Sequence, residues 1–534
     1  MAFVGVSTYL TFPVFDFELL MLAPSIFNDV LGPIMRGPSS SHSAASVRIG
    51  RLARDLAGGD LQHALIEFDP NGSLATTHES QGSDMGLFGG LLGWEADDPR
   101  LPDGKAALQQ QGIDVEIVIR DIQATHPNTY QLTVRNQQDT HVLIADSLGG
   151  GMIVVNQIDG QAVKLYGDFF VTLLKGGDAT QVAALKSALP DAVSIQSGES
   201  WTVVESTQFV EQGTANQLGF PTVRYLHPVL PVPSLPEMKL PFRSTAEMVQ
   251  LCDPQTVPLS YFALEYETAR SGRQPEEVLQ MMSHIRDIMR GSIDAGLAGT
   301  HYADRILGNQ SAGFRLALSQ GKLLEGGMVN QMVLYVTALM EAKSAMETIV
   351  AAPTAGSCGT FPGTCLAAAD QLQLDDACLL PAMLSGGLIG VLVATRSSFA
   401  AEVGGCQAET GAGSAMAAAS LVEMMGGNAA QSLSAASLAL QNVLGLVCDP
   451  VANRVEAPCL GRNVAGASNA FISANMALAG YDALIPFDEV LDAHREISHS
   501  MPRELRCTAL GGLSITPTSK AIEQRICGGG CQCG

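Results

Sequence analysis

The sequence predicts a multidomain protein in which an N-terminal α+β domain is followed by a mostly α-helical domain. Its 534 residues exceed what one ordinary hydrophobic core contains. Residues 45–165 show strand-like alternation in segments such as VEIVIR, YQLTV and HVLIAD, mixed with short helical runs. Residues 246–480 are rich in Ala, Leu, Met and Gly, with helical periodicity and almost no strand signal.

The composition is that of a well-buried globular protein. Hydrophobic residues make up 46% and charged residues 16%, and the 55 glycines allow helices to approach closely. The net charge of -23 opposes phosphate backbones and anionic membrane surfaces, so neither nucleic acid nor a membrane is expected as a partner. Eleven cysteines, an odd number spread over a long chain, fit a reducing compartment, and we expect a cytoplasmic protein.

The first half divides into three segments. Residues 1–25 are a leader of doubtful status, because the apolar start lacks Lys, Arg and a signal-peptide cleavage site. Residues 26–166 form the predicted α+β domain. Residues 167–212 contain GDFFVTLL, TQVAALKSAL and ESWTVVES, an order that predicts a small β-α-β module of the regulatory kind or its remnant.

The second half begins after a proline-rich linker, residues 213–242. Each proline pushes the residue before it to an extended conformation, so this segment is not a helix. Residues 243–525 form the helical domain, and 526–534 are a Cys/Gly tail. Within the helical domain, the apolar run 379–395 contains Pro381, and we predict a buried helix pair there rather than a membrane span.

Three cysteines of the helical domain share a local character. Cys406 lies in GGCQAE, Cys448 in GLVCDPV and Cys459 in EAPCLGRN, each close to a glycine or proline where backbone amides can point at sulfur. Their spacing matches neither a zinc ribbon nor a ferredoxin. Spacing alone therefore leaves two interpretations open, metal ligands or small core residues.

Several motifs extend this pattern. The three cysteine segments, together with PTAGSCGTFPGT (353–364), RNVAGASNAFISANMALAG (462–480) and GGLSITPT (511–518), closely resemble the α domain of bacterial iron-sulfur L-serine dehydratases. GPSSSHSAASVRIG (37–50), NGSLATT (71–77) and HPNT (126–129) resemble the β domain of the same family. The resemblance covers residues 26–160 and 242–525 in one fused chain.

The resemblance implies a cofactor and a reaction. Cys406, Cys448 and Cys459 match the ligands of a 4Fe-4S cluster, which makes the helical domain a cluster-binding catalytic domain. A fourth iron without a protein thiolate acts as a Lewis acid on a leaving hydroxyl. The implied enzyme is an oxygen-sensitive lyase, a homodimer, that converts a small β-hydroxy amino acid, L-serine by default, to pyruvate and ammonia.

Two histidines are candidates for the base that removes the α-proton. The resemblance assigns this role to His126 of HPN, and places His42 of SSSH near the entrance of the same active site. A neutral imidazole acts as a base at physiological pH. The alternative for each histidine is a structural one, in which the ring fixes a loop by hydrogen bonds.

The expected substrate-binding residues also have structural alternatives. Short side chains or amides that can donate hydrogen bonds occur in two loops, one at an expected helix N-terminus and one in a turn. Two further polar residues follow a predicted cluster ligand. The alternatives are plain capping, a tight turn and contact with a helix terminus. The candidates are Ser39, Ser40, Ser41, Thr354, Gly356, Ser357, Arg462 and Asn463.

The chain departs from the family pattern at three places. Gln81 stands where a histidine is usual, RSSFAA (396–401) replaces Asn-Ala-Ser-Ile-Ser-Gly, and Cys507 replaces a glutamate. These changes leave open a cysteine desulfidase-type lyase or another lyase of β-substituted amino acids. A non-catalytic iron-sulfur sensor is a further alternative, and the penultimate Cys533 is a candidate tail ligand of the open iron.

Overall fold

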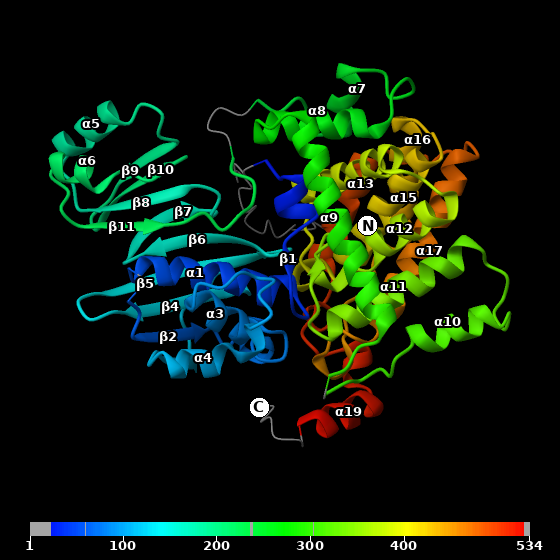
Figure 1. The fold of residues 1–534 in the computed structure, drawn as a ribbon, viewed down its shortest axis with the longest axis horizontal. Coiled ribbons are helices and arrows are strands. Elements are labelled where there is room, and N and C mark those ends of the chain that lie inside the picture. The colour runs from blue at the N-terminus through cyan, green and yellow to red at the C-terminus, as the bar shows by residue number, and fades with distance from the viewer. Residues whose placement is uncertain (1–22, 59, 235–238, 303, 528–534) are drawn as a thin grey trace, which may run out of the picture.

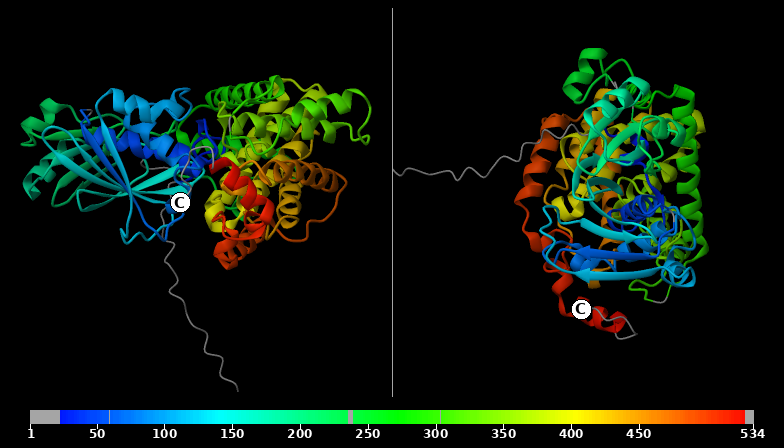
Figure 2. Two further views of the ribbon diagram at one scale, coloured as in Figure 1. Left: turned by 90° about the horizontal axis from the view of Figure 1, so that it is seen from below. Right: turned by 90° about the vertical axis from the view of Figure 1, so that its left-hand side faces the viewer.

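The computed structural model describes residues 23–58, 60–234, 239–302 and 304–527. A part with two β-sheets lies beside a larger helical part, on the left and right of Figure 1. The two parts lie end to end when the molecule is seen from below (Figure 2). This layout confirms the predicted order of an α+β region followed by a helical region.

The first sheet has six strands in the order β3-β2-β4-β5-β6-β7. Only the pair β2 and β3 is parallel among these ladders; the others are antiparallel. Side chains alternate as expected, so that Tyr130, Leu132 and Val134 of β4 are buried. The strands are β2 (His63–Phe68), β3 (Asp114–Ile119), β4 (Thr129–Arg135), β5 (Thr140–Gly149), β6 (Met152–Ile158) and β7 (Gln161–Leu165). The helices of this part are α1 (Ala45–Leu56), α2 (Leu74–Thr77), α3 (Ser83–Leu91) and α4 (Gly104–Gln110).

The second sheet is antiparallel, with the order β11-β8-β10-β9. It contains β8 (Phe170–Lys175), β9 (Ser194–Ser197), β10 (Trp201–Ser206) and β11 (Val223–Leu226), with helices α5 (Ala179–Ala188) and α6 (Gln212–Gln217). The expected β-α-β order is present, but α6 and β11 extend the module into residues 213–226, which we had predicted as linker. Buried Phe220 and Leu226 explain the difference, because they anchor this segment before the dense prolines begin at Pro228.

The helical part surrounds α15 (Ala412–Met424), in which every residue except Glu423 is buried. Its small side chains allow α13, α16 and α17 to pack closely around it. The helices are α7 (Thr245–Leu251), α8 (Leu259–Ser271), α9 (Pro275–Ala298), α10 (Ser311–Ser319), α11 (Met328–Ser344), α12 (Thr360–Leu372), α13 (Asp376–Arg396), α14 (Ala401–Gly404), α16 (Ala429–Gln441), α17 (Cys459–Leu478), α18 (Phe487–Ser500) and α19 (Pro517–Cys527).

The apolar run 379–395 lies in one continuous helix, α13, so the predicted helix pair is wrong. Pro381 is the sixth residue of this helix, so it removes one hydrogen bond near the N-terminal end but does not divide the helix. This helix is long and apolar enough to cross a membrane, but 78% of its most apolar window is buried inside the protein. That burial is typical of a core helix.

The first described residues enter the helical part. The helical turn η1 (Ile26–Val30) packs on α13, where Gly387 and Gly390 leave room for Ile26 and Val30. The short strand β1 (Ile34–Met35) then pairs with β12 (Ile349–Val350). The segment we had assigned to the α+β domain therefore begins in the helical core. Residues 1–22 of the expected leader and Cys533 of the tail lie outside the described residues.

Candidate active site

The serine-rich loop of the first part meets the helical part at Glu402. Ser41 Oγ donates to Glu402 Oε1 over 2.8 Å, across the boundary between the two parts. Ser40, in the same helical turn η2 (Ser40–Ala44), accepts a hydrogen bond on Oγ from the amide of Ala355 at 3.2 Å. Ser39, Ser40 and Ser41 thus lie where the two parts touch.

Hydrogen-bond accounting gives the tautomer of His42. Thr77 uses its hydroxyl proton on Ser73 O at 2.7 Å, so its oxygen accepts from His42 Nε2 at 2.9 Å. The Ser41 proton goes to Glu402, which leaves the Ser39 hydroxyl to donate to His42 Nδ1 at 3.0 Å. Burial lowers the pKa of His42, and the ring is neutral at neutral pH.

His126 lies half-buried just before β4. Its Nδ1 accepts a hydrogen bond from the amide of Asn128 at 3.2 Å, which assigns the proton of the neutral ring to Nε2. Burial lowers the pKa of this ring, although the nearby carboxylates of Asp146 and Glu402 act in the opposite direction and raise it. In this arrangement the free nitrogen of His126, Nε2, carries a proton and can donate a hydrogen bond but not accept one.

The three predicted cluster ligands converge, although they come from distant segments. Cys406 precedes the helical turn η5 (Gln407–Gly411), Cys448 lies in the loop after α16, and Cys459 is the first residue of α17. All three thiols are buried, with 3%, 4% and 6% of their surface exposed. The ligand atoms of Cys406, Cys448 and Glu409 lie within 4.8 Å of one another.

The charges around the thiols differ. The hydrogen bond with Cys448 lowers the pKa of Cys406, and the Arg462 guanidinium lowers it further by donating to the sulfur at 3.4 Å. The same hydrogen bond raises the pKa of Cys448. Burial, followed by the charge of Cys406, raises the pKa of Cys459. A bound cation would instead lower the pKa values of Cys448 and Cys459, because a cation favours the thiolate form of its ligands. The three thiols therefore suit a metal that binds thiolates.

A small pocket joins the serine loop to the thiols. Five of the predicted site residues line it, namely Ser39, Ser41, Gly356, Cys448 and Cys459. Cys406 lies behind Cys448, with which it packs. The remaining lining residues are Pro38, Gln81, Ala401, Glu402, Glu409, Pro450, Val455 and Cys507.

The turn before α12 forms one wall of this pocket. Thr354 Oγ1 donates to Glu409 Oε1 at 2.6 Å and caps the turn η4 (Ala355–Ser357), within which Ser357 also bonds back to Thr354. At Gly356 a Cβ would stand 2.6 Å from Glu409 Oε1, so a larger residue there would displace the Glu409 carboxyl group.

Arg462 and Asn463 already have partners inside the protein. Arg462 donates to Asp449 at 2.5 Å as well as to Cys406. The Asn463 amide donates to the carbonyls of Gly356 and Cys459, both at 2.8 Å. These two side chains hold the walls of the pocket in place.

All three departures from the family pattern reach this pocket, although RSSFAA does so only through its last residue. Buried Gln81 donates from Nε2 to Asn453 at 3.3 Å and toward the Cys507 sulfur at 3.9 Å. Arg396, by contrast, pairs with Asp492 at 2.6 Å at the end of α13. Of the RSSFAA segment, Ala401 is the residue that lines the pocket.

Sequence reasoning did not select three charged residues of the site as candidates. Glu402 receives the Ser41 hydrogen bond, and burial, followed by the charge of Cys406, raises the pKa of Glu409 to about 8. Lys343 is fully buried in α11 and donates to the carbonyl of Val455. The available signal was an ionisable residue in a segment of mostly small or apolar residues, GGCQAET for Glu409 and ALMEAKSAM for Lys343.

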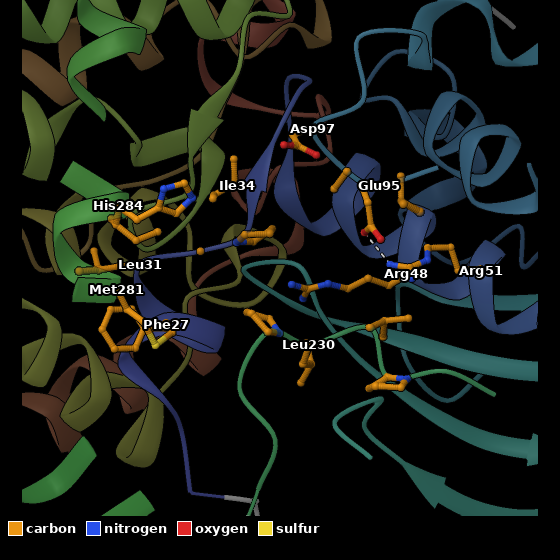
Figure 3. A pocket seen from close by; sticks show the side chains of 18 of the residues that line it. Phe27, Leu31, Ile34, Arg48, Arg51, Glu95, Asp97, Leu230, Met281 and His284 are labelled. Carbon is orange, nitrogen blue, oxygen red and sulfur yellow. Dashed lines mark hydrogen bonds and ion pairs between the residues drawn. The ribbon is translucent and has the colours of Figure 1, made fainter. Parts of the chain in front are cut away.

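A second cavity, of about 580 Å³, shares none of the described residues that line the thiol pocket. Figure 3 shows Arg48 and Arg51 of α1 on one side and Met281 and His284 of α9 on the other. Arg51 forms an ion pair with Glu95 at 2.5 Å. No thiol is among its lining residues in the described chain, so the chemistry predicted above belongs to the smaller pocket.

Comparison with known proteins decides the family. Residues 254–514 match the family model described as serine dehydratase alpha chain. The probable L-serine dehydratase alpha chain of Bacillus subtilis is 40% identical over 288 residues, which cover 54% of this chain and 96% of that relative. The chain belongs to the L-serine dehydratase family.

Other members of the L-serine dehydratase family match more of the chain or its other half. L-serine dehydratase 2 of Escherichia coli is 27% identical over 494 residues, 90% of this chain and 96% of the relative. The probable beta chain of the Bacillus subtilis enzyme is 36% identical over 154 residues, 29% of this chain and 69% of the relative. The family resemblance and the enzyme class predicted from the sequence are confirmed.

Proposed function

We propose that this enzyme converts L-serine to pyruvate and ammonia with a 4Fe-4S cluster held by Cys406, Cys448 and Cys459. The observation that carries the proposal is that Cys448 and Cys459, from distant segments, line a pocket with the serine loop, while buried Cys406 packs directly behind Cys448. The names of the relatives support L-serine as the substrate.

The donor set fits such a cluster. Thiolates are the usual ligands of iron-sulfur clusters, and Cys459 begins a helix of 20 residues whose N-terminal dipole favours a negative sulfur. When bound, the cluster would supply a Lewis acid for the departure of the substrate hydroxyl.

Proton transfer is assigned to Ser39 and His42. The Ser39 hydroxyl lines the pocket and donates to His42 Nδ1, so Ser39 can take the α-proton while passing its own proton to the ring. The hydrogen bond from Nε2 to Thr77 fixes the ring orientation. His126 holds its proton on Nε2 and is the second candidate, acting as a donor.

The shape of the pocket supports a small substrate. Its walls near the serine loop are formed by short side chains such as Ser39, Ser41 and Ala401, with Gly356 opposite Glu409. The Arg462 guanidinium donates hydrogen bonds to Cys406 and Asp449, so we do not assign the substrate carboxylate to it.

We further propose a cellular compartment, an oligomeric state and a division into domains for this enzyme. The eight cysteines whose side chains the structure describes are free, which supports a reducing cytoplasm. We likewise propose the expected homodimer. We also propose that the parts behave as the domains expected from the sequence, with the module boundary moved to residue 226.

The test is an anaerobic assay of reconstituted protein. L-serine should give pyruvate and ammonia in equal amounts, whereas a cysteine desulfidase-type enzyme would release sulfide from L-cysteine more efficiently. Ammonia release from neither substrate, nor from other small β-substituted amino acids, would favour the sensor interpretation and overturn the proposal. Brief exposure to air before the assay should abolish the activity.

A further inference from the structure

A fourth thiol lies beside the three predicted ligands. Cys507 is 7% exposed and lines the same pocket as Cys448 and Cys459. With Ala401, Cys406 and Cys448 it forms one small buried cluster, against which Leu446 packs. Four cysteine side chains from four separate segments thus surround one place in the structure.

The main chain holds Cys507 next to Cys448. The amide of Cys448 donates to Leu505 O at 2.8 Å, and the amide of Cys507 donates back to Cys448 O at 3.0 Å. Cys507 has φ +58°, a left-handed conformation that is unfavourable for a residue with a Cβ. Such a conformation persists where the surrounding contacts impose it, and it is frequent at functional sites.

The contacts of the sulfur suit a ligand. Its neighbours are the thiol of Cys448 and the Gln81 amide, whose Nε2 lies 3.9 Å away. An amide that points at sulfur stabilises a thiolate. A thiol buried for packing alone would have apolar neighbours, as Cys358 has in Met340.

We propose that Cys507 is a fourth thiolate ligand of the cluster in the substrate-free enzyme, at the iron that Cys406, Cys448 and Cys459 leave open. The proposal rests on the cluster of the proposed function. On binding, the Cys507 S–H bond breaks, its proton goes to solvent and the sulfur donates an electron pair to iron, with no change of oxidation state. Substrate competes for this position, and the departing thiolate recovers a proton from solvent.

The experiment compares Cys507→Ala with the matched control Cys365→Ala, which removes another buried thiol from α12, outside the pocket. Iron and sulfide contents and Mössbauer spectra of isotopically enriched, anaerobic protein are recorded without substrate. Cys507→Ala should keep a cluster but show one iron with distinct parameters. It should also form the three-iron species, detected by electron paramagnetic resonance, several-fold faster after a pulse of air.

Each outcome decides between the proposals. A cluster in wild type whose spectra and rate of iron loss are the same in Cys507→Ala overturns the role of Cys507 and leaves the proposed function intact. An iron-free wild-type protein after reconstitution overturns both. Cys507→Ser, which keeps the side-chain size, replaces the alanine variant if that variant unfolds. Removal of residues 528–534 should change nothing, and if it reproduces the distinct iron instead, the tail is the ligand and the proposal is wrong.

Discussion

Ser41 Oγ donates a hydrogen bond of 2.8 Å to Glu402 Oε1 and so links the serine loop of the first part to the helix that leads into Cys406. Both side chains are largely buried, with 7% of Ser41 and 6% of the Glu402 side chain exposed. A hydrogen bond to a buried charged group is worth more than one at the surface. The contact therefore couples the packing of the two parts to the geometry of the site.

The first prediction concerns this coupling. A double-mutant cycle with Ser41→Ala and Glu402→Met should give an interaction free energy of about 1 to 2 kcal/mol in chemical unfolding, because each single variant leaves its buried partner unsatisfied. Ser187→Ala, which removes an exposed hydroxyl of α5, is the control and should change stability by less than about 0.5 kcal/mol. Additive effects of the two site variants would show that the contact does not couple the parts.

The second prediction concerns the cluster ligands. Cys406→Ala, Cys448→Ala and Cys459→Ala should each abolish the visible absorbance of anaerobically purified protein, since each removes a permanent ligand of the cluster, whereas Cys507 holds only the iron that substrate also occupies. Wild type should contain about four irons per chain. Cys378→Ala, which removes an exposed thiol of α13, should retain the absorbance. A full cluster in all three ligand variants would contradict the assignment.

Local patterns predicted much of this molecule. Alternation located the strand-rich half, small residues located the helical half, and the three cysteines selected from the sequence lie close together at the pocket or just behind it. Contacts between distant segments were beyond local reasoning. Ile26 enters the helical core because Gly387, far along the chain, leaves room for it. Cys507 was recognised only as a departure from a pattern, because its place beside Cys448 depends on main-chain hydrogen bonds between two loops.

The third prediction concerns stability and pH. Burial raises the pKa of Glu267 to about 7 from its ordinary value of 4.5, and the side chain accepts hydrogen bonds from Ser25 and Ile26. A carboxyl with a raised pKa binds its proton more tightly in the folded state, so the free energy of unfolding should fall as pH rises from 4.5 to 7. Glu267→Gln should flatten this fall in urea titrations. Glu265→Gln, on the same helix, is the control and should leave the slope unchanged.

The fourth prediction separates the two histidines. The family resemblance makes His126 the base, for which His126→Ala would lose on the order of 100-fold in turnover. The geometry favours His42, whose Nδ1 holds a lone pair toward Ser39 of the pocket, whereas His126 accepts from Asn128 and carries its proton on Nε2. We therefore expect His42→Ala to cost at least about 100-fold in kcat, more than His126→Ala, with cluster absorbance retained in both.

The pH profile gives this prediction a second readout. A base must be neutral to act, and burial lowers the pKa of His42 below its ordinary 6.5. The acid limb of kcat/KM should consequently lie below pH 6.5, with activity retained as pH falls through that value and lost only at the lowered pKa. Ser39→Ala should lose most turnover without moving this limb, since it removes the relay and leaves the ring. Two results together would show that His126 is the base. His126→Ala would lose more kcat than His42→Ala, and the fall of kcat/KM at acid pH would be unchanged in His42→Ala.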